Sequence, residues 1–257
     1  MVHAAVYCHM GRGRKNNEDN FYLDGFWKPR ERANHNCLEG KSVPLPALFA
    51  VLDGMGGEQY GEVASATAAA LLHEHRGVFL RGPDPEHVGA ERISQLSGAL
   101  WRSYKESGYR IGTTLAAAVI REHDLYLFGL GDSRIYLLEN GKLTQVTQDH
   151  TIAAETAYNT LSGGRARPSM NVHSNQLTQY FGMDCSEYDA APCHSRYPLR
   201  QGMKILLCSD GLYNALEESE MAATLAQSIP MVAVQRLIDL ALDKDAKDNI
   251  TAMVLAV

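Results

Sequence analysis

A run of apolar residues that ends in an aspartate and glycines constrains this chain more than any other feature. Leu48–Leu52 contains no glycine, proline or charge, which predicts a buried β-strand. Asp53 follows, then the glycine-rich Gly54–Gly57, which can turn sharply and approach a ligand closely. A carboxylate beside backbone carbonyls suits a hard divalent cation, although an Asp-Gly turn between two elements would give the same pattern. Other parts of the chain must decide between these two interpretations.

Runs with β character cluster at both ends and in the middle of the chain, whereas most helical patterns come in pairs. This differs from the regular βαβα alternation of a parallel fold, so we expect an α+β fold in which helices cover antiparallel sheets. Strands are predicted at Val2–His9, Phe21–Leu23, Leu48–Leu52, Thr113–Ile120, Leu125–Leu130, Arg134–Leu138, Leu143–Thr147, around Tyr188–Tyr197, and at Met203–Ser209 and Ile250–Val257. Helices are predicted at Gly61–His75, from Asp84-Pro85 to Glu106, and at Ile152–Thr160, Glu217–Gln227 and Val232–Leu242.

Turn signals and irregular segments separate these elements. Asn140-Gly141, between two strand-like runs, is a strong hairpin signal. Residues 25–46 are rich in charge and proline and are interpreted as a surface loop. Residues 149–180 are polar and contain glycines. A loop of that length is uncommon unless it is functional or mobile.

Charge and composition argue against several classes of partner. The net charge of −6 and a pI near 5.9 give no sign of the excess positive charge that is typical of proteins that bind nucleic acids or membrane surfaces. There is no apolar run near the roughly 20 residues of a membrane helix, and the N-terminus lacks a signal-peptide layout. The five cysteines are odd in number and form no Cys-x-x-Cys pair, which argues against a disulfide framework or a zinc knuckle. We expect a cytoplasmic protein.

Four aspartates share one arrangement, each at the edge of a strand-like run, and three of them adjoin a glycine. Each alone is most simply a turn former. If the strand ends meet, the carboxylates repel one another and bound cations relieve that repulsion. Oxygen ligands without His or Cys favour Mg²⁺ or Mn²⁺ over Zn²⁺, and two such ions about 4 Å apart can hydrolyse phosphate esters through an activated water. The four are Asp53, Asp132, Asp210 and Asp248, and Asp19 fits the pattern more loosely.

A basic residue lies in the loop between the first two predicted strands. Arg14 is surrounded by glycines and amides in residues 11–20, and Glu18 and Asp19 follow it. The planar guanidinium can bind two phosphate oxygens at once, which would place a phosphate next to metal-binding acids. The simpler alternative is a polar hairpin turn.

Seven motifs in this order resemble those of the metal-dependent PP2C-type (PPM) serine/threonine protein phosphatases, in a compact bacterial form. They are R-x-x-N-E-D (14–19), DGMGG with GExAS (53–65), IGTTL (111–115), GDSR (131–134), DHT (149–151), SDGL (209–212) and DNIT (248–251). The resemblance spans about residues 11–254. It implies one catalytic domain over residues 1–257, an α-β-β-α sandwich of two antiparallel sheets flanked by helix pairs, metals at one end of the sandwich, and a flap at about 149–180.

The resemblance also implies a role for each acid. Asp53 would bridge two core metal ions, Mn²⁺ or Mg²⁺, and the carbonyl of Gly54 would bind one of them. Asp210 and Asp248 would complete the second core site. Asp132, together with Asp210, would hold a weaker third ion of the kind that bacterial members bind.

The remaining implied roles concern the substrate and the surroundings of the metals. Arg14 would hold the substrate phosphate and act in catalysis together with the bridging Asp53. Asp19 would reach a core metal through or beside bound water, and Glu18 would support it. Asn249 is interpreted either as a support for the metal ligands or as a structural residue.

Three features depart from the family pattern or lie outside it. Met55 occupies the middle of DGMGG, where many eukaryotic members have a histidine proposed to protonate the leaving alcohol, so the general acid is unassigned. In the flap, Arg165 and Arg167 could contact an acidic or phosphorylated substrate or could simply be solvated. The loop 25–46 is longer than expected and is a candidate partner surface.

The function expected from the sequence is metal-dependent hydrolysis of phosphoserine and phosphothreonine in proteins by a monomer that opposes a Ser/Thr kinase. Two alternatives stay open. One is a weakly active or inactive PP2C-like binding or regulatory module. The other is a phosphatase with a different substrate, either in a sigma-factor regulatory pathway or among phosphorylated small molecules.

Overall fold

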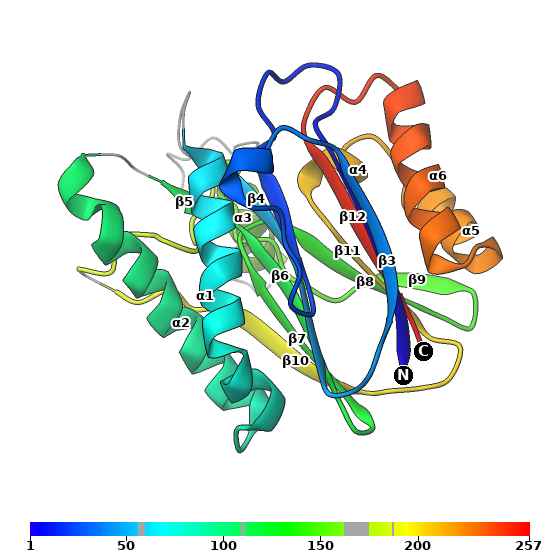
Figure 1. The fold of residues 1–257 in the computed structure, drawn as a ribbon, viewed down its shortest axis with the longest axis horizontal. Helices are drawn as coiled ribbons and strands as arrows, with labels where there is room; N and C mark the ends of the chain where they lie inside the picture. Colours follow the sequence, from blue (N-terminus) through cyan, green and yellow to red (C-terminus); the bar gives the residue numbers. More distant parts are fainter. Residues whose placement is uncertain (56–59, 109–110, 162–174, 187) are drawn as a thin grey trace.

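The computed structural model describes residues 1–55, 60–108, 111–161, 175–186 and 188–257. Within these residues the strands form two six-stranded sheets that pack against each other, and helices cover both outer faces (Figure 1). Every strand pair is antiparallel. The predicted α+β sandwich of two antiparallel sheets flanked by helices is therefore confirmed.

The two sheets draw on strands from distant parts of the chain. Across the first sheet lie, in order, β3 (Cys37–Val43), β1 (Val2–His9), β12 (Ile250–Ala256), β11 (Lys204–Cys208), β8 (Arg134–Glu139) and β9 (Lys142–Gln145). Across the second lie β10 (Cys193–Pro198), β7 (Asp124–Leu130), β6 (Leu115–Arg121), β4 (Ala47–Met55) and β2 (Asp19–Leu23), with β5 (Gly112–Thr113) paired to the end of β4.

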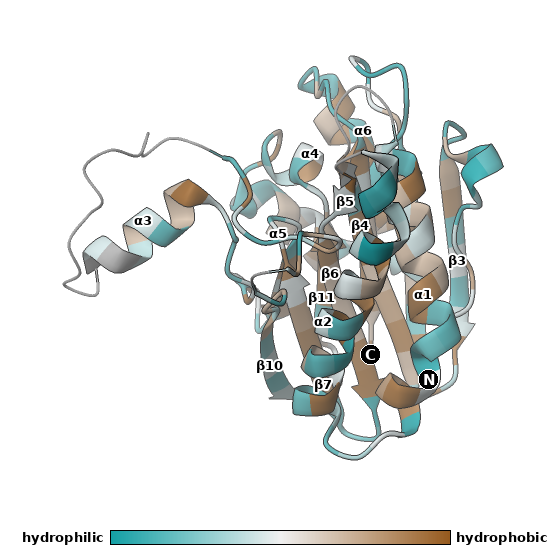
Figure 2. Ribbon diagram, turned by 90° about the vertical axis from the view of Figure 1, so that its left-hand side faces the viewer, coloured by the Kyte–Doolittle hydropathy of each residue, from teal (hydrophilic) through white to brown (hydrophobic). Residues whose placement is uncertain are grey.

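Two helix pairs form the outer layers. The second sheet is covered by α1 (Gly61–Arg81) and α2 (Pro85–Tyr104), and the first by α5 (Glu218–Gln227), α6 (Pro230–Asp243) and the short α4 (Asp210–Tyr213). Figure 2 shows α3 (Ile152–Leu161) standing away from these layers. Short 3₁₀ turns occur at η1 (Arg30–Arg32) and η2 (Lys105–Ser107). Within the part of the chain that the structure describes, no helix has the length and apolar character needed to cross a membrane.

The strand β4 lies in the middle of the second sheet and is buried on both faces. Leu48 and Leu52 face the layer of α1 and α2, whereas Phe49 and Val51 pack between the two sheets. A strand that is covered on both sides needs apolar residues at every position, which explains the uninterrupted run in the sequence. Burying each of the large side chains favours folding by about 1.5–3 kcal/mol.

Local signals located several element ends correctly. Asp84 caps α2 by accepting a hydrogen bond from the His87 backbone N–H at 3.4 Å, and Pro85 occupies the first helical position. Asn140 and Gly141 both have positive φ, at 51° and 78°, in the turn between β8 and β9. The predicted cap and hairpin are confirmed.

The prediction of an irregular loop over residues 25–46 is wrong for Cys37–Val43, which forms β3 at the edge of the first sheet. Most of its residues are exposed, and Glu39 and Lys41 alternate with glycine and serine. An edge strand with a solvated face shows no apolar alternation, and charged side chains protect it from pairing with other chains. The strand predicted around Tyr188–Tyr197 begins only at Cys193.

Candidate metal centre

The proposed site residues come from distant parts of the sequence but meet at one end of the sandwich. They border a cleft of about 350 Å³ where β4 ends and β12 begins. The residues that line it are Arg14, Glu18, Asp53, Gly54, Met55, Thr114, Asp132, Leu177, Asp210, Asp248 and Asn249. Of the residues proposed from the sequence, only Asp19 is absent from this lining.

Asp19 lies behind the cleft, directly opposite Asp53 on the paired strands β2 and β4. Its side chain is 1% exposed, and Oδ2 accepts hydrogen bonds from the hydroxyls of Ser209 and Thr251, both at 2.7 Å. The other oxygen, Oδ1, is buried and has no hydrogen-bond partner among the described residues. Burial raises the pKa of Asp19 to about 7, although both hydroxyls act against this shift. An unsatisfied buried carboxylate oxygen is costly, so this atom is suited to a cation or a water that a cation holds.

The backbone of Asp53 is fixed from the opposite side of the strand. Its N–H donates to Thr114 Oγ1 at 3.0 Å, and its carbonyl accepts from the Thr114 N–H at 2.8 Å and the Thr113 hydroxyl at 2.9 Å. The carboxylate is thereby left to face the cleft. Burial, followed by repulsion from Asp19 and the other cleft aspartates, raises the pKa of Asp53 well above its ordinary value.

Two further acids follow strand ends in the first and second sheets. Asp132 lies in the turn between β7 and β8, next to Gly131, whose φ of 97° favours glycine. Burial, with a contribution from Asp210, raises the pKa of Asp132 to about 7. Asp210 opens α4 immediately after β11, and burial and repulsion by Asp248 raise its pKa, whereas Arg14 lowers it.

Arg14 lies at the mouth of the cleft, paired with Asp248. Its Nε contacts Asp248 Oδ1 at 2.7 Å and its Nη2 donates to Oδ2 at 2.8 Å, so the pairing is bidentate. The hydrogen bond to Asp248 is the main cause of a raised pKa for Arg14. Because the arginine side chain is 53% exposed, this ion pair contributes at most about 1 kcal/mol to stability. The ion pair holds the positively charged guanidinium of Arg14 beside the acids of the cleft.

Close backbone packing explains the glycines around the cleft. A Cβ on Gly54 would lie 2.1 Å from the carbonyl oxygen of Gly61, and one on Gly61 would lie 2.7 Å from Glu18 Oε1. The Gly54 N–H also donates to the Glu18 carbonyl at 3.2 Å. The end of β4, the start of α1 and Glu18 can therefore approach one another only because both positions lack side chains. Burial, with repulsion from Glu62, raises the pKa of Glu18.

Asn249 connects the loop that carries Arg14 to the start of β12. Its Oδ1 accepts from the Glu18 N–H at 2.8 Å, and its Nδ2 donates to the carbonyls of Met10 at 2.8 Å and Asn16 at 3.0 Å. The residue is 4% exposed, and these bonds use both of its amide protons and one acceptor site of its carbonyl oxygen. Of the two roles considered for Asn249, the contacts favour the structural one.

The donor set fits Mg²⁺ or Mn²⁺. The acids offer carboxylate oxygens, several have a raised pKa caused mainly by burial, and the Gly54 backbone carbonyl lies at the same cleft. Among the described residues, no three His, Cys, Asp or Glu side chains already surround one point closely enough to hold an ion. The acids that line the cleft do not form such a group.

Sequence reasoning missed several residues that contact the site acids, among them Ser209 and Thr251. Ser209 and Thr251 bind Asp19 Oδ2, although they lie 190 and 232 residues away from it. Both are polar residues in or beside otherwise apolar strands, and each is part of a site motif, which is the signal that could have identified them. Arg134, the last residue of the GDSR motif, pairs with Asp149 at 2.7 Å and lies over the Tyr213 ring at 3.6 Å.

Part of the predicted flap lies outside the described residues. Arg165 and Arg167 lie outside the described residues, as do Gly56 and Gly57 of the glycine-rich turn. Of the described flap residues, Leu177 lines the cleft and pairs with Thr151 through an isolated bridge. The segment therefore borders the acids at its C-terminal end.

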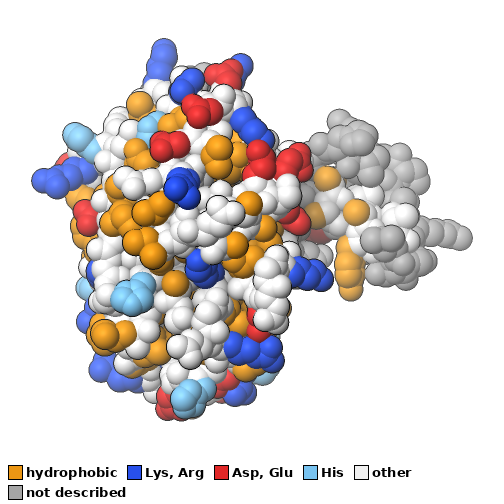
Figure 3. All heavy atoms as spheres, turned by 90° about the vertical axis from the view of Figure 1, so that its right-hand side faces the viewer, with side chains coloured by type: hydrophobic (Ala, Val, Ile, Leu, Met, Phe, Trp, Pro, Cys, Tyr) orange, Lys and Arg blue, Asp and Glu red, His pale blue; other side chains and the backbone are white. Residues whose placement is uncertain are grey.

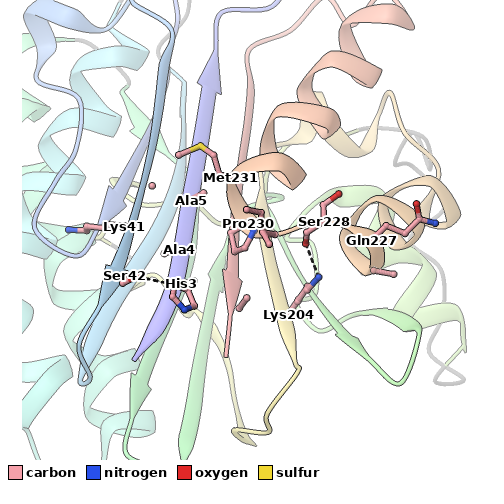
Figure 4. Close-up of a pocket in the computed structure, with 14 residues that line it drawn as sticks. His3, Ala4, Ala5, Lys41, Ser42, Lys204, Gln227, Ser228, Pro230 and Met231 are labelled. Carbon is pink, nitrogen blue, oxygen red and sulfur yellow. Dashed lines mark hydrogen bonds between the residues drawn. The ribbon is translucent and has the colours of Figure 1, made fainter.

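A larger cavity, of about 720 Å³, lies elsewhere, between the first sheet and the junction of α5 and α6 (Figure 4). Its lining includes His3, Lys204, Pro230 and Met231 and contains no carboxylate. Figure 3 shows basic, acidic and hydrophobic side chains interspersed on the face that carries these helices. Since phosphate ester hydrolysis needs groups that this cavity lacks, the smaller acidic cleft is the stronger catalytic candidate.

Known proteins resemble this chain over most of its length. The family model described as Protein phosphatase 2C matches residues 40–245, a range that contains Asp53, Asp132 and Asp210 and excludes the Arg14 loop and Asp248. The chain is 32% identical over 219 residues to the serine/threonine protein phosphatase PstP of Mycobacterium tuberculosis, covering 80% of this chain but only 40% of PstP. It is 30% identical over 230 residues to the serine/threonine phosphatase stp of Listeria welshimeri, covering 86% of this chain and 81% of stp.

Solved structures resemble the whole described fold. PppA of Pseudomonas aeruginosa, described as a key regulatory component of T6SS, superposes with a TM-score of 0.77 at 28% identity and covers 99% of this chain and 97% of PppA. The catalytic domain of PstP in complex with two manganese ions superposes with a TM-score of 0.75 at 27% identity, covering 100% of this chain and 99% of that domain.

Proposed function

This chain belongs to the protein phosphatase 2C family, and on that basis we propose that it hydrolyses phosphoserine and phosphothreonine in proteins in a metal-dependent reaction. One observation carries the proposal: four aspartates from strand ends line one cleft, and Asp19 lies opposite one of them with a buried Oδ1 that has no hydrogen-bond partner among the described residues. Such a cluster is unfavourable without cations. We propose that residues 1–257 act as one catalytic domain, with 149–180 as its flap.

The proposed ions are two Mn²⁺ or Mg²⁺, with a weaker third. Asp53 and the Gly54 carbonyl would hold the first, and Asp53, Asp210 and Asp248 the second. Asp132, with Asp210, would hold the third. When bound, such ions activate a water and stabilise the oxygens of an in-line displacement at phosphorus.

The chain's own residues would position these groups and the substrate. Ser209 and Thr251 hold Asp19 Oδ2, which leaves Oδ1 for a water or an ion. Arg14 would exchange part of its bidentate contact with Asp248 for two phosphate oxygens of the substrate. Met55 borders the cleft but has no proton to donate, so it does not serve as the general acid.

The partners follow from this chemistry. We propose that the substrates are phosphorylated proteins, either a cognate Ser/Thr kinase itself or the targets of that kinase. We also propose that the protein acts as a monomer in the cytoplasm. The cysteine pattern, which indicates a reducing compartment, supports that location.

The test uses matched phosphopeptides. The purified protein is stripped with EDTA and then assayed with phosphothreonine, phosphoserine and phosphotyrosine forms of one peptide, before and after Mn²⁺ or Mg²⁺ is added. We expect phosphate release from the first two peptides, only with metal, and none from the Asp53→Asn variant. An Asp243→Asn variant, which changes an exposed acid at the end of α6, is the matched control.

Other outcomes separate the alternatives. Mn²⁺ binding measured by calorimetry without hydrolysis of any peptide would favour a binding or regulatory module. Preference for a small phosphate ester over the phosphothreonine peptide would favour a different substrate class. Hydrolysis that continues in EDTA would contradict the metal-dependent mechanism.

A further inference from the structure

Two cysteines face each other across the edge of the first sheet. Cys8 in β1 pairs in register with Cys37 in β3, the edge strand that was not expected from the sequence. Cys8 belongs to the core between the sheets and Cys37 packs against that core, so both side chains lie on the same face. Directly opposed residues have Cβ atoms about 4.5–5.5 Å apart and Cα atoms within the range of about 4.4–6.8 Å that a disulfide spans. A disulfide needs Cβ atoms about 3.5–4.5 Å apart, so the two strands must approach each other by up to about 1 Å for the sulfurs to join.

The surroundings of this pair provide both access and positive charge. Cys37 is half-buried and lines a cavity of about 450 Å³ together with Lys28, Arg32 and His35. Lys28 is only 2% exposed, and its ammonium donates to the Ala33 carbonyl at 2.8 Å. Burial raises the pKa of Cys8 and raises that of Cys37 to about 11, and the charge of Lys28 acts against both shifts. The cavity gives a small oxidant access to Cys37. Because the thiolate is the reacting form and burial keeps the pKa raised, oxidation should become faster as pH increases.

We propose that Cys8 and Cys37 are a modification site, a thiol pair that a peroxide oxidises to a cross-strand disulfide. Hydrogen peroxide first oxidises the accessible Cys37 thiol to a sulfenic acid and is reduced to one water. The Cys8 sulfur then attacks the Cys37 sulfur and forms the S–S bond. The sulfenic hydroxyl takes the Cys8 thiol proton and leaves as a second water. Overall, two thiols and one peroxide give one disulfide and two waters.

The pair is coupled to the candidate metal centre through Cys8. Its Sγ lies 3.6 Å from the Asp19 carbonyl oxygen and accepts from the Asn17 amide at 3.5 Å. Asn17 Oδ1 in turn accepts from the Asp19 N–H at 3.1 Å. A disulfide would turn the Cys8 sulfur toward Cys37. Asp19, the first residue of β2, would then lose these contacts. This second part rests on the proposed metal site, and we expect about tenfold weaker Mn²⁺ binding, the size of effect seen when a ligand's supporting contacts are lost.

The experiment combines mass spectrometry with calorimetry on the full chain. The protein is treated with hydrogen peroxide, its remaining thiols are alkylated, and peptides are mapped. We expect one disulfide that joins Cys8 to Cys37 and is reversed by dithiothreitol, with Mn²⁺ affinity falling and recovering in parallel. Cys37→Ser should keep its Mn²⁺ affinity after the same treatment. Cys185→Ser, another half-buried cysteine, should respond like the unmodified protein.

Each other result counts against the proposal. Alkylation of both Cys8 and Cys37 after oxidation, or a disulfide between other cysteines, would overturn it. A Cys8–Cys37 disulfide with unchanged Mn²⁺ affinity, or an equal loss of affinity in oxidised Cys37→Ser, would overturn the coupling to the metal centre. If untreated protein binds no Mn²⁺, the metal site fails, and the peptide map still decides whether the disulfide forms.

Discussion

Asp19 and Asp53 lie directly opposite each other on two paired antiparallel strands, so two carboxylates share one step of the sheet. Like charges in this arrangement destabilise a strand pair. The hydroxyls of Ser209 and Thr251 satisfy only one oxygen of Asp19, and the other is buried without a partner among the described residues. The fold therefore brings acids together in a way that protons or cations must compensate.

Removing one of these charges should stabilise the metal-free protein. We expect Asp53→Asn to raise the free energy of unfolding in EDTA by about 1 kcal/mol, because the repulsion across the strand pair is lost. The same variant should lose the stabilisation that Mn²⁺ gives to the unmodified protein. Thermal unfolding with EDTA and with Mn²⁺ measures both effects, and Asp243→Asn should change neither. A less stable metal-free Asp53→Asn protein would contradict the account.

The stability of the metal-free protein should fall as pH rises from about 4 to 7. The pKa values of Asp19 and Asp132 are raised to about 7 in the fold, whereas an unfolded aspartate titrates near 3.9. Between these values the folded state binds more protons than the unfolded state, so the contribution to stability is full below the unfolded pKa and is lost as pH passes the folded pKa. Denaturant unfolding in EDTA at pH 5 and pH 8 checks the sign.

Metal binding should show the opposite dependence on pH. Mn²⁺ must displace the protons held by Asp19 and Asp132, so its affinity should rise as pH increases toward and beyond 7. Calorimetry in two buffers of different ionisation enthalpy should detect proton release on binding at pH 6 and less of it at pH 8. Equal proton release at both pH values would indicate that these carboxylates are not ligands.

Arg14 is expected to act through the paired N–H donors of its guanidinium and not only through its charge. The bidentate contact with Asp248 shows that both donor edges can meet a planar or tetrahedral anion. We expect Arg14→Lys to lower kcat/KM for a phosphothreonine peptide by about 100-fold, the usual loss for a group that stabilises a developing oxyanion. Mn²⁺ affinity should change little. Lys15→Ala, at the neighbouring exposed cation, is the control and should keep nearly full activity.

Asn249 is expected to matter for stability. Asn249→Ala leaves the Glu18 N–H and the carbonyls of Met10 and Asn16 without their partner. We expect a loss of about 2 kcal/mol in the free energy of unfolding, measured in EDTA so that metal binding does not contribute. Gln95→Ala, on the exposed side of α2, should change it by less than about 0.5 kcal/mol.

Local patterns explain which parts of the fold could be predicted. Leu48–Leu52, the Asp84 cap and the Asn140-Gly141 turn each carry their signal within a few neighbouring residues, and all three agree with the structure. The strand β3 was missed because its exposed edge carries Glu39, Gly40 and Lys41 in place of an apolar alternation. Its pairing with β1, and with it the facing cysteines, depends on contacts that no local pattern records.

The candidate site shows the same limit. The acids could be proposed because each stands at a strand end beside a recurring motif, and the structure brings them to one cleft. The register that sets Asp19 against Asp53 could not be proposed, since a shift of one residue would leave the motif unchanged. The roles of Ser209 and Thr251 likewise depend on strands brought together from opposite ends of the chain.

The central claim is that the aspartates at this end of the sandwich bind the divalent ions needed for phosphate ester hydrolysis. The most direct measurement is a calorimetric titration of the EDTA-stripped protein with Mn²⁺, beside the same titration of Asp53→Asn. The account predicts at least two Mn²⁺ ions bound per chain and loss of the tight sites in the variant. Equal binding by both proteins, or no binding by either, would contradict it.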